Sequence, residues 1–489
     1  MNKFLLIAGF LALGQYAQAQ EPAENLDRNK RWTLQELVDY ANQNNLQVRQ
    51  SELDLLSSEV ELKRSKMDLL PSLNGNASYS YSVGRSINPF TNIIEDQPIS
   101  SQNYSLNSGF TLFNGFALRN TIKQNQLNLN AANFTLADIR NDISLNVATA
   151  YLNILLNQEL LNNAEARLVV SKNQLDRTEK LIKAGSQPET ARFEFNAQVA
   201  NDMLAVTNAN NNLEIARLSL KQLLQIPAEE PLLVYIPELD IQEATPYPTS
   251  SNAVYEQALT NQPDIQAANL QVQSSELGVA VAKGRLLPTL SINGGVSTAY
   301  SSLAPDVLPA ENAETISMQV PIGYYLDGAG NPVEVVTDRD IPLEFEENTY
   351  INQLDYNLRR FVQVNMNIPI FNGYRARSNV AQARISADRA QLQVKQVRQQ
   401  LRQNIEQAAL DVQAAALSYR ASEQQVLSLR EALKATNIRL DAGAASPLDY
   451  SLAKANLDAA EANFIRSKYD YIFKTKVLDF YSGQPLSLK

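Results

Sequence analysis

Apolar and polar residues alternate along four stretches of the chain. In the clearest one, 72–83, the even positions hold only Ser or Asn, and the odd positions hold apolar or small side chains. Stretches 103–113, 289–300 and 357–371 repeat the pattern, the last interrupted by Arg360. Period-two alternation predicts β-strands with one polar face. At about 11–13 residues they exceed ordinary strands and suit a tilted membrane strand, although a long soluble hairpin on a core fits the pattern equally well.

A different period marks the segments that follow these strands. Phe116 to Ile182 contains neither Pro nor Gly, so at about 1.5 Å per residue it can form a helix on the order of 100 Å long. Apolar residues recur there at every seventh position: Val147, Ile154, Leu161, Leu168, Leu175 and Ile182. The second half of the chain has the same series: Ile405, Val412, Tyr419, Val426, Leu433 and Leu440. A sustained seven-residue repeat predicts coiled-coil packing.

The two halves of the chain are related by constant offsets. The segment Leu70–Leu73 recurs as Leu287–Leu290, 217 positions later, and Phe113-Asn114-Gly115 recurs 258 positions later. The jump of 41 between the two offsets indicates one insertion in the second half, within 301–356. Internal repeats of this length indicate a duplicated structural unit.

Each repeat is predicted to read helix, strand, strand, long helix, turn, helix. The first repeat, 20–250, is expected to contain helix 33–67, strands 72–83 and 103–113, long helix 116–182, tip turn 184–188 and helix 188–225. The second, 251–489, is expected to contain helix 251–285, strands 289–300 and 357–371, long helix 374–441, tip turn 442–446 and helix 447–482. The insertion 301–356 is predicted to be a long acidic loop on the extracellular side.

The N-terminus has the form of an export signal. Lys3 is followed by the apolar stretch Phe4–Leu13, and Ala17-Gln18-Ala19 is a small-x-small cleavage site. These features predict that residues 1–19 are a secretory signal peptide. The mature protein is therefore expected outside the cytoplasm.

Composition narrows the possible chemistry. The 489 residues include no Cys and no His, which excludes disulfides, thiolate or imidazole metal sites, and Cys or His catalysis. We expect no cofactor, no enzymatic activity and no lipid on an N-terminal Cys. The net charge of −10 argues against nucleic acid as a partner. Acidic residues are scattered on helices or in one loop, which disfavours a carboxylate-only hydrolase.

Hydropathy and connectivity indicate which kinds of membrane protein remain possible. The mean hydropathy is −0.27, and no apolar run of 18 residues occurs beyond the first twenty positions, which excludes a helical membrane protein but not an alternating barrel. The strands are linked tightly to helices at one end and by long loops at the other, as in outer-membrane barrels. Four strands cannot close a barrel; a dimer would supply eight, and a trimer twelve with an open pore.

The order of these features resembles the TolC-type outer-membrane factors, the outer membrane efflux protein family. The resemblance rests on the duplicated unit, the signal peptide, the Leu-Pro-Ser-Leu and Leu-Pro-Thr-Leu segments, and Phe-Asn-Gly after the second strand of each repeat. It implies an internally duplicated α+β membrane protein that contributes four strands to a trimeric 12-stranded transmembrane β-barrel. A long periplasmic α-helical coiled-coil barrel would continue from it.

The resemblance also implies a function. The homotrimer would be the passive exit duct of a tripartite efflux or type I secretion system in the outer membrane. It would open when a periplasmic adaptor, or membrane fusion protein, and an inner-membrane pump of the resistance–nodulation–division or ATP-driven class dock on it. The alternative is an exported structural coiled coil or adhesin without channel activity, which would neither insert in membranes nor conduct ions.

Matching the tip glycines places the family's gate after the second tip turn. Asp449 falls on an acidic gate position, but the next acidic position falls on Leu452, so an apolar constriction remains an alternative to an acidic ring. The basic and acidic partners of the family's gate bonds fall on Ala445 and Ala191, so a different bond network is expected. Asp449 could equally serve only the helix N-terminus.

The turn residues themselves are candidates for contact with the adaptor. These adaptor-docking candidates are Ala184, Gly185, Ser186, Ala442, Gly443 and Ala444. Reversing the chain is a sufficient role for the glycines. Docking at these residues is implied by the family resemblance alone.

Overall fold

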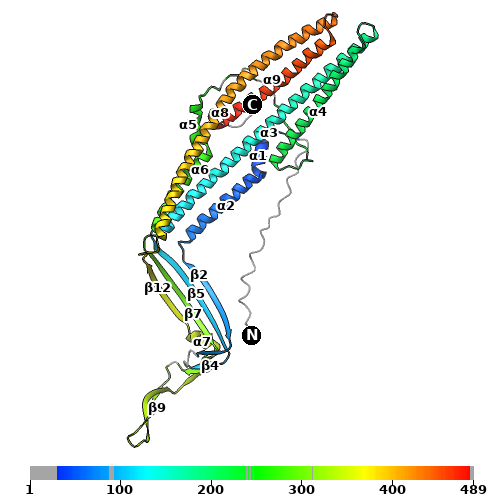
Figure 1. Ribbon diagram of the computed structural model, residues 1–489. Coiled ribbons are helices and arrows are strands. Elements are labelled where there is room, and N and C mark those ends of the chain that lie inside the picture. Colours follow the sequence, from blue (N-terminus) through cyan, green and yellow to red (C-terminus); the bar gives the residue numbers. More distant parts are fainter. Residues whose placement is uncertain are drawn as a thin grey trace. The chain divides into compact units, whose positions relative to one another are not determined.

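The computed structural model describes residues 30–87, 93–237, 241, 244–245, 247–310 and 312–484 (Figure 1). The predicted signal peptide, 1–19, lies outside the described residues. The described chain divides into two compact units. The helical unit comprises the residues up to Leu55, Ala132–Ala268 and those from Val394 onward. The sheet unit comprises Leu56–Ala131 and Asn269–Gln393.

Four long helices dominate the helical unit. Helices α3 (Ala117–Lys183) and α8 (Arg375–Asp441) have 67 residues each, and α4 (Thr190–Leu224) and α9 (Pro447–Tyr481) have 35 each. In α8 every predicted heptad residue is buried except the half-buried Leu433; in α3 the first three are buried and the last three half-buried. The seven-residue pattern therefore marks packed faces. Among the described residues, no helix combines the length and the apolar character that a membrane crossing requires.

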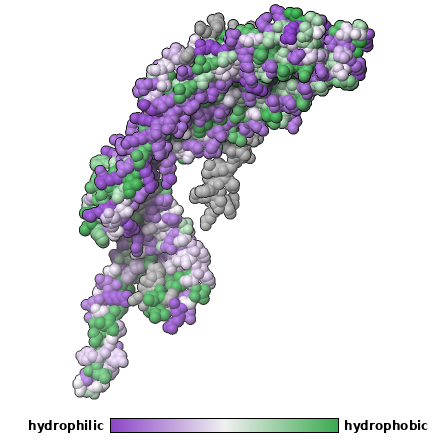
Figure 2. All heavy atoms as spheres, turned by 45° about the horizontal axis from the view of Figure 1, so that its top comes forward, coloured by the Kyte–Doolittle hydropathy of each residue, from purple (hydrophilic) through white to green (hydrophobic). Residues whose placement is uncertain are grey.

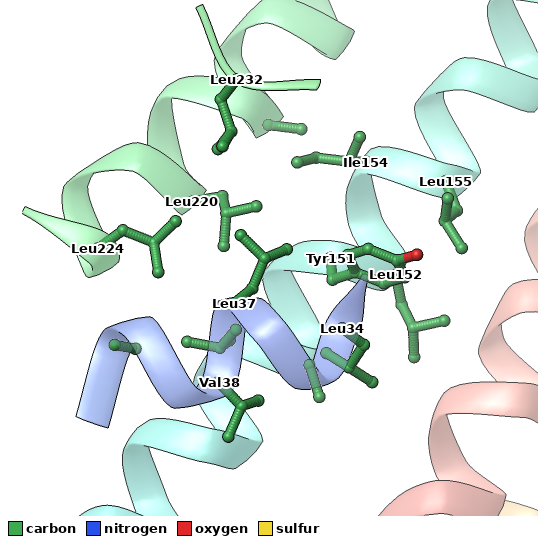
Figure 3. Close-up of a cluster of buried hydrophobic side chains, with 14 of the residues drawn as sticks. Leu34, Leu37, Val38, Tyr151, Leu152, Ile154, Leu155, Leu220, Leu224 and Leu232 are labelled. Atoms are coloured by element: carbon green, nitrogen blue, oxygen red, sulfur yellow. The ribbon is translucent and has the colours of Figure 1, made fainter. Parts of the chain in front are cut away.

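The largest hydrophobic core joins segments from both repeats. Helix α1 (Leu34–Asn44) inserts Leu37 between α3 and α4, where it meets Tyr151 and Leu220 (Figure 3). These three side chains are at most 1% exposed. The Tyr151 hydroxyl donates to the carbonyl of Tyr235, which satisfies the polar end of this buried ring. Ile465 and Tyr469 of α9 belong to the same core.

The predicted helices 33–67 and 251–285 are each broken in two. The first consists of α1 and α2 (Leu46–Met67), separated by Asn45, whose side chain accepts from Gln47 N at 2.8 Å and caps the new helix. The second consists of α5 (Ser251–Asn261) and α6 (Pro263–Gly284). Gln262 between them is extended, because the residue before a proline disfavours the helical conformation. The two single helices were therefore wrong.

The sheet unit is built on one antiparallel sheet of order β12-β7-β5-β2. Its strands are β2 (Ser72–Ser82), β5 (Ile99–Asn114), β7 (Thr289–Ser301) and β12 (Arg359–Asn367). Strand β5 pairs with β7, so the two repeats meet at the middle of the sheet. The outer strands β2 and β12 each have one edge that pairs with no strand in the described chain. The predicted strand 357–371 is shorter than expected because Pro369 cannot donate to a ladder.

The strand register brings the predicted apolar positions onto one face. Directly paired residues share a face, and the pairs Phe110↔Ile292 and Ile292↔Val364 run across three strands. Leu73 and Val364, on this face, are 68% and 62% exposed in a single chain. The sheet therefore presents a broad apolar face that its own chain does not cover.

The Asn-Gly pairs build the same turn between strand and long helix in both repeats. Gly115 and Gly373 have φ of +65° and +63°, which favours glycine. The side chain of Asn114 accepts from Leu118 N at 3.2 Å, and Asn372 accepts from Ala376 N at 3.3 Å. These contacts begin α3 and α8. At Gly115 an added Cβ would also lie 2.2 Å from the carbonyl oxygen of Gly284, so only glycine fits.

The insertion 301–356 was predicted as one long acidic loop, and the structure shows that it contains regular elements. It contains a hairpin of β9 (Thr315–Leu326) and β10 (Pro332–Pro342), a short pair of β8 (Val307–Pro309) and β11 (Phe345–Glu347), and helix α7 (Tyr350–Tyr356). The alternation of Ile316, Met318 and Val320 indicated a strand, but the surrounding acidic residues and Pro321 obscured it. Two further short pairings are β3 (Arg85–Ile87) with β4 (Ile94–Asp96), and β1 (Arg31–Trp32) with β6 (Leu233–Val234).

Candidate functional site

The first tip turn, between α3 and α4, is closed by backbone hydrogen bonds. Ser186 N donates to the Leu181 carbonyl and Gly185 N to the Ile182 carbonyl, both at 2.9 Å. Gly185 has φ +78°. This pair of bonds around a left-handed residue is a Schellman motif, which satisfies carbonyls at a helix end.

The second tip turn, between α8 and α9, has the same construction. Ala444 N donates to the Arg439 carbonyl at 2.8 Å and Gly443 N to the Leu440 carbonyl at 3.0 Å. Gly443 has φ +71°, and nothing lies within 4 Å of an added Cβ there or at Gly185. Backbone conformation alone therefore selects glycine at both tips. All six docking candidates are exposed: Ala184, Gly185, Ser186, Ala442, Gly443 and Ala444.

Helix α9 begins with a complete capping box. Ser446 Oγ accepts from Asp449 N at 3.1 Å, and Asp449 Oδ2 accepts from Ser446 N at 2.9 Å and from Ser446 Oγ at 2.8 Å. The backbone N–H and hydroxyl of Ser446 hold the pKa of the Asp449 carboxyl below its usual range. The gate candidate Asp449 is thus ionised near neutral pH, and both hydrogen bonds to its carboxylate fix it against its own helix start.

The other gate candidate, Leu452, lies in an exposed apolar stripe. Leu448 and Leu452 are 65% and 61% exposed, and Ala455 and Ala459 continue the stripe at coiled-coil spacing. The opposite side of α9 is turned inward, with Tyr450 buried. The stripe is therefore not part of the core of its own chain.

Two contacts join the two helical hairpins, α3–α4 and α8–α9, close to their tips. The rings of Phe195 in α4 and Tyr450 in α9 pack with centroids 5.8 Å apart, and both side chains are buried. Arg177 in α3 forms a salt bridge with Asp441 in α8 at 2.8 Å. Each contact connects the first repeat to the second.

A buried network of four charges joins the hairpins further along the helices. Lys454 Nζ lies 3.1 Å from Asp202 and 2.8 Å from Asp458, and Arg167 lies 3.0 Å from Asp458. The Lys454 and Asp202 side chains are only 3% and 2% exposed. We call these residues the four-charge network. Two cations face two carboxylates, so the buried charges balance.

Hydrogen bonds around Asp202 complete this network. Burial alone would raise the pKa of Asp202, but the Ser171 hydroxyl, Lys454 and Gln198 outweigh it and hold the pKa below its usual range. Sequence reasoning missed the network. Its only local sign is the spacing of Lys454 and Asp458 by four residues, because the other partners lie more than 250 positions away.

The two positions where the family's gate partners were expected carry no polar side chain. Ala191 is 1% exposed, and Ala445 is half-buried against the core of Phe195 and Tyr450. Charged contacts between the hairpins lie instead in the four-charge network, in the Arg177–Asp441 pair and in the Lys468–Glu159 pair. In the described part of the chain, no group of three or more acidic side chains is arranged to hold a metal ion.

The sequence is similar to proteins of a known family. The model of the outer membrane efflux protein family matches residues 37–224 and 357–484, one segment in each repeat. TolC of Vibrio cholerae serotype O1 is 22% identical over 332 residues, 67% of this chain and 64% of that protein. TolC of Escherichia coli K12 is 26% identical over 62% of this chain and 58% of that protein. The chain thus aligns with less than two thirds of the length of these relatives.

Solved structures share the fold over nearly the whole chain. A structure of CusC superposes with a TM-score of 0.73 at 19% identity, covering 96% of this chain and 99% of that one. VceC of Vibrio cholerae gives a TM-score of 0.71 at 15% identity, covering 93% and 97%. With the family model matched in both repeats, the chain belongs to the outer membrane efflux protein family.

Proposed function

We propose that three copies of this chain form a passive exit duct through the outer membrane for an efflux or type I secretion system. The observation that carries the proposal is the four-stranded sheet with two unpaired edges and one uncovered apolar face. Four strands are too few to close a barrel, whereas twelve leave a water-filled lumen. Pairing of β2 in one copy with β12 in the next would remove every open edge, and the apolar face would meet lipid.

The proposed gate is the exposed stripe after the second tip. Three copies of α9 around one axis would bring three Leu452 side chains together, with three Asp449 carboxylates close by. Because Asp449 is already engaged by Ser446, Leu452 is the better candidate for the constriction itself. An apolar ring would exclude water and ions without any bond between protomers.

The proposed docking surface is the pair of tip turns. Its six residues are small and exposed, so a partner helix could approach the backbone closely. A periplasmic adaptor and an inner-membrane pump would bind there and draw the tips apart. In this proposal the duct is passive, and the energy for transport would come from the pump.

The oligomer tests this proposal directly. The mature protein, purified in detergent, is expected to have the mass of three chains by light scattering and to insert into lipid vesicles. A monomer that remains in the aqueous phase without detergent would reject the duct and favour the exported coiled-coil alternative.

A further inference from the structure

The insertion between β7 and β12 carries the net charge of the whole chain. Residues 301–356 hold eleven acidic side chains and one basic side chain, Arg339, so their net charge equals the −10 of the full sequence. The rest of the chain has 41 charges of each sign. Solubility alone does not require that the net charge be concentrated in one segment.

The hairpin of β9 and β10 separates this charge from an apolar face. Register places Ile316, Met318, Val320 and Tyr325 of β9 opposite Ile341, Arg339, Thr337 and Val333 of β10, on one face. Val335 lies on the same face opposite Gly323. The other face bears Glu334, Asp338 and Asp340. Arg339 is thus the only charged residue of the first face, which we call the hairpin apolar face.

This apolar face is uncovered in a single chain. Ile316, Met318 and Tyr325 are 48%, 50% and 57% exposed. Within the described chain, strands β9 and β10 pair only with each other. Figure 2 shows hydrophobic surface, in green, on this narrow projection. A two-stranded hairpin is marginally stable alone in water, so a cover for its apolar face is expected.

The base of the hairpin is anchored to the sheet. Gln353 of α7 accepts from Ser301 N at 3.1 Å, and the Tyr350 hydroxyl donates to Gln102 Oε1 at 2.7 Å. Strands β8 and β11 pair below the hairpin. The projection therefore starts at the ends of β5 and β7 that lie opposite to the ends connected to the helices.

We propose that the hairpin apolar face packs against the same faces of the other two protomers and forms a cap over the extracellular mouth of the channel. This inference rests on the proposed trimer. The hairpin projects from the loop ends of the strands, and in a closed barrel these ends of all three protomers surround one mouth, so a second copy is within reach. Segregation of the acids on the opposite face lets the apolar faces meet while the carboxylates stay in water. A lipid surface is the poorer occupant, because a net charge of −10 is repelled by lipid phosphates.

Site-specific cross-linking tests the cap, since the chain has no Cys. Met318→Cys on the apolar face should give a covalent dimer with a short bismaleimide within the intact trimer. Gln319→Cys, on the acidic face of the same strand, is the matched control and should give severalfold less covalent dimer. Added salt should raise the Met318→Cys yield, because it screens repulsion between the acidic faces.

The possible outcomes distinguish a failure of the proposed cap from a failure of the proposed duct. Equal cross-linking of the two variants in a protein that is still trimeric would overturn the cap and leave the duct intact. Absence of any trimer by light scattering would overturn the duct itself. Conductance gives a second readout in a Leu452→Ser background, which removes the proposed constriction at the tip. In that background Met318→Asp should conduct severalfold more than Gln319→Asp, and equal conductance of the two variants would also overturn the cap.

Discussion

The two repeats have helices of equal length and the same Schellman turns, but their tips are not equally well fixed. Helix α9 starts with the Ser446–Asp449 capping box and Pro447, whereas Glu189, at the start of α4, makes no side-chain capping bond. Pro at the first helical position and a capping box both favour one start point. The repeat that bears the gate candidates is therefore the one whose tip is more precisely defined by local bonds.

The repeats also differ in the positions of the charges that they bring to their contact. The first repeat contributes Arg167 and Asp202 to the four-charge network, and the second contributes Lys454 and Asp458. At an offset of 258 the equivalent positions carry no charge: Gln425 and Ala460 in the second repeat, and Asn196 and Ala200 in the first. The network is therefore not a repeated feature, and it ties the better-defined tip to the other helical hairpin.

The largest expected effect comes from removing one charge of the network. Lys454→Met leaves two carboxylates and one cation buried, which should lower the free energy of unfolding by about 3–5 kcal/mol. Denaturation in detergent, followed by far-UV circular dichroism, measures this. Lys434→Met, at an exposed pair with Glu431, is the control and should change little. A similar small loss in both variants would mean that the network does not hold the hairpins together.

The tip glycines provide the second test, in which the repeats should behave alike. Gly185→Ala and Gly443→Ala each force a left-handed backbone on alanine, at a cost of roughly 1–2 kcal/mol. Since both sites are sterically open, the two losses of stability should agree. Thermal unfolding of the two variants measures this. A clearly larger loss of stability at one tip would mean that the glycine there makes a contact that is absent from the single chain.

A smaller effect is expected from Asp138, a carboxylate present only in the first repeat. Burial, together with Asp264 and Asp142, raises the pKa of Asp138 to about 6, and the equivalent position in the second repeat is Gln396. An unfolded Asp titrates near 3.9, so this group stabilises the fold at low pH and that contribution is lost as pH rises through 6. Stability should fall by about 1 kcal/mol between pH 5 and 7.5 after allowance for solvent screening.

Asp138→Asn should reduce this pH dependence, as measured by thermal unfolding at the two pH values; the part due to Asp142 and Asp264, whose pKa values are also raised by burial, should remain. Gln396→Asp, at an exposed position of α8, is the matched control and should add none. An unchanged pH profile in Asp138→Asn would contradict the assignment to this group.

The smallest effect concerns the helix caps. Ser446→Ala removes the capping box and should cost about 1 kcal/mol, seen as roughly fivefold faster hydrogen exchange in the first turn of α9. Glu189→Ala has no capping bond to lose and should leave exchange at the start of α4 nearly unchanged. Equal acceleration at both tips would remove the proposed difference between them.

Local patterns were sufficient to predict much of this fold. The heptads from Val147 and Ile405 mark the buried faces of the long helices, and alternation marks the four strands of the sheet. The break before Pro263 was missed, although the residue before a proline disfavours the helical conformation. The break at Asn45 combines the local bond from Gln47 N with a hydrogen bond from the Asn45 side chain to the Leu223 carbonyl, 178 positions away, and the second bond could not be predicted from the sequence.

The candidate site was less predictable than the fold. The exposed tip turns follow from Gly185 and Gly443 with their neighbouring prolines, but the use of Asp449 in a capping box competes with its use in a gate. The partners of Lys454 could not be predicted, because they depend on how α3, α4 and α9 pack together. Side chains that act across the repeats require tertiary structure, whereas those that act within one helix do not.

Single-channel conductance in planar bilayers tests the central claim most directly. Wild-type trimers should insert and conduct weakly, because the Leu452 stripe closes the tip. Leu452→Ser should conduct severalfold more, and Asp449→Asn should change conductance less. Inserted trimers whose conductance is the same in wild type and Leu452→Ser would contradict a gate at this stripe, and trimers that never conduct would contradict the duct.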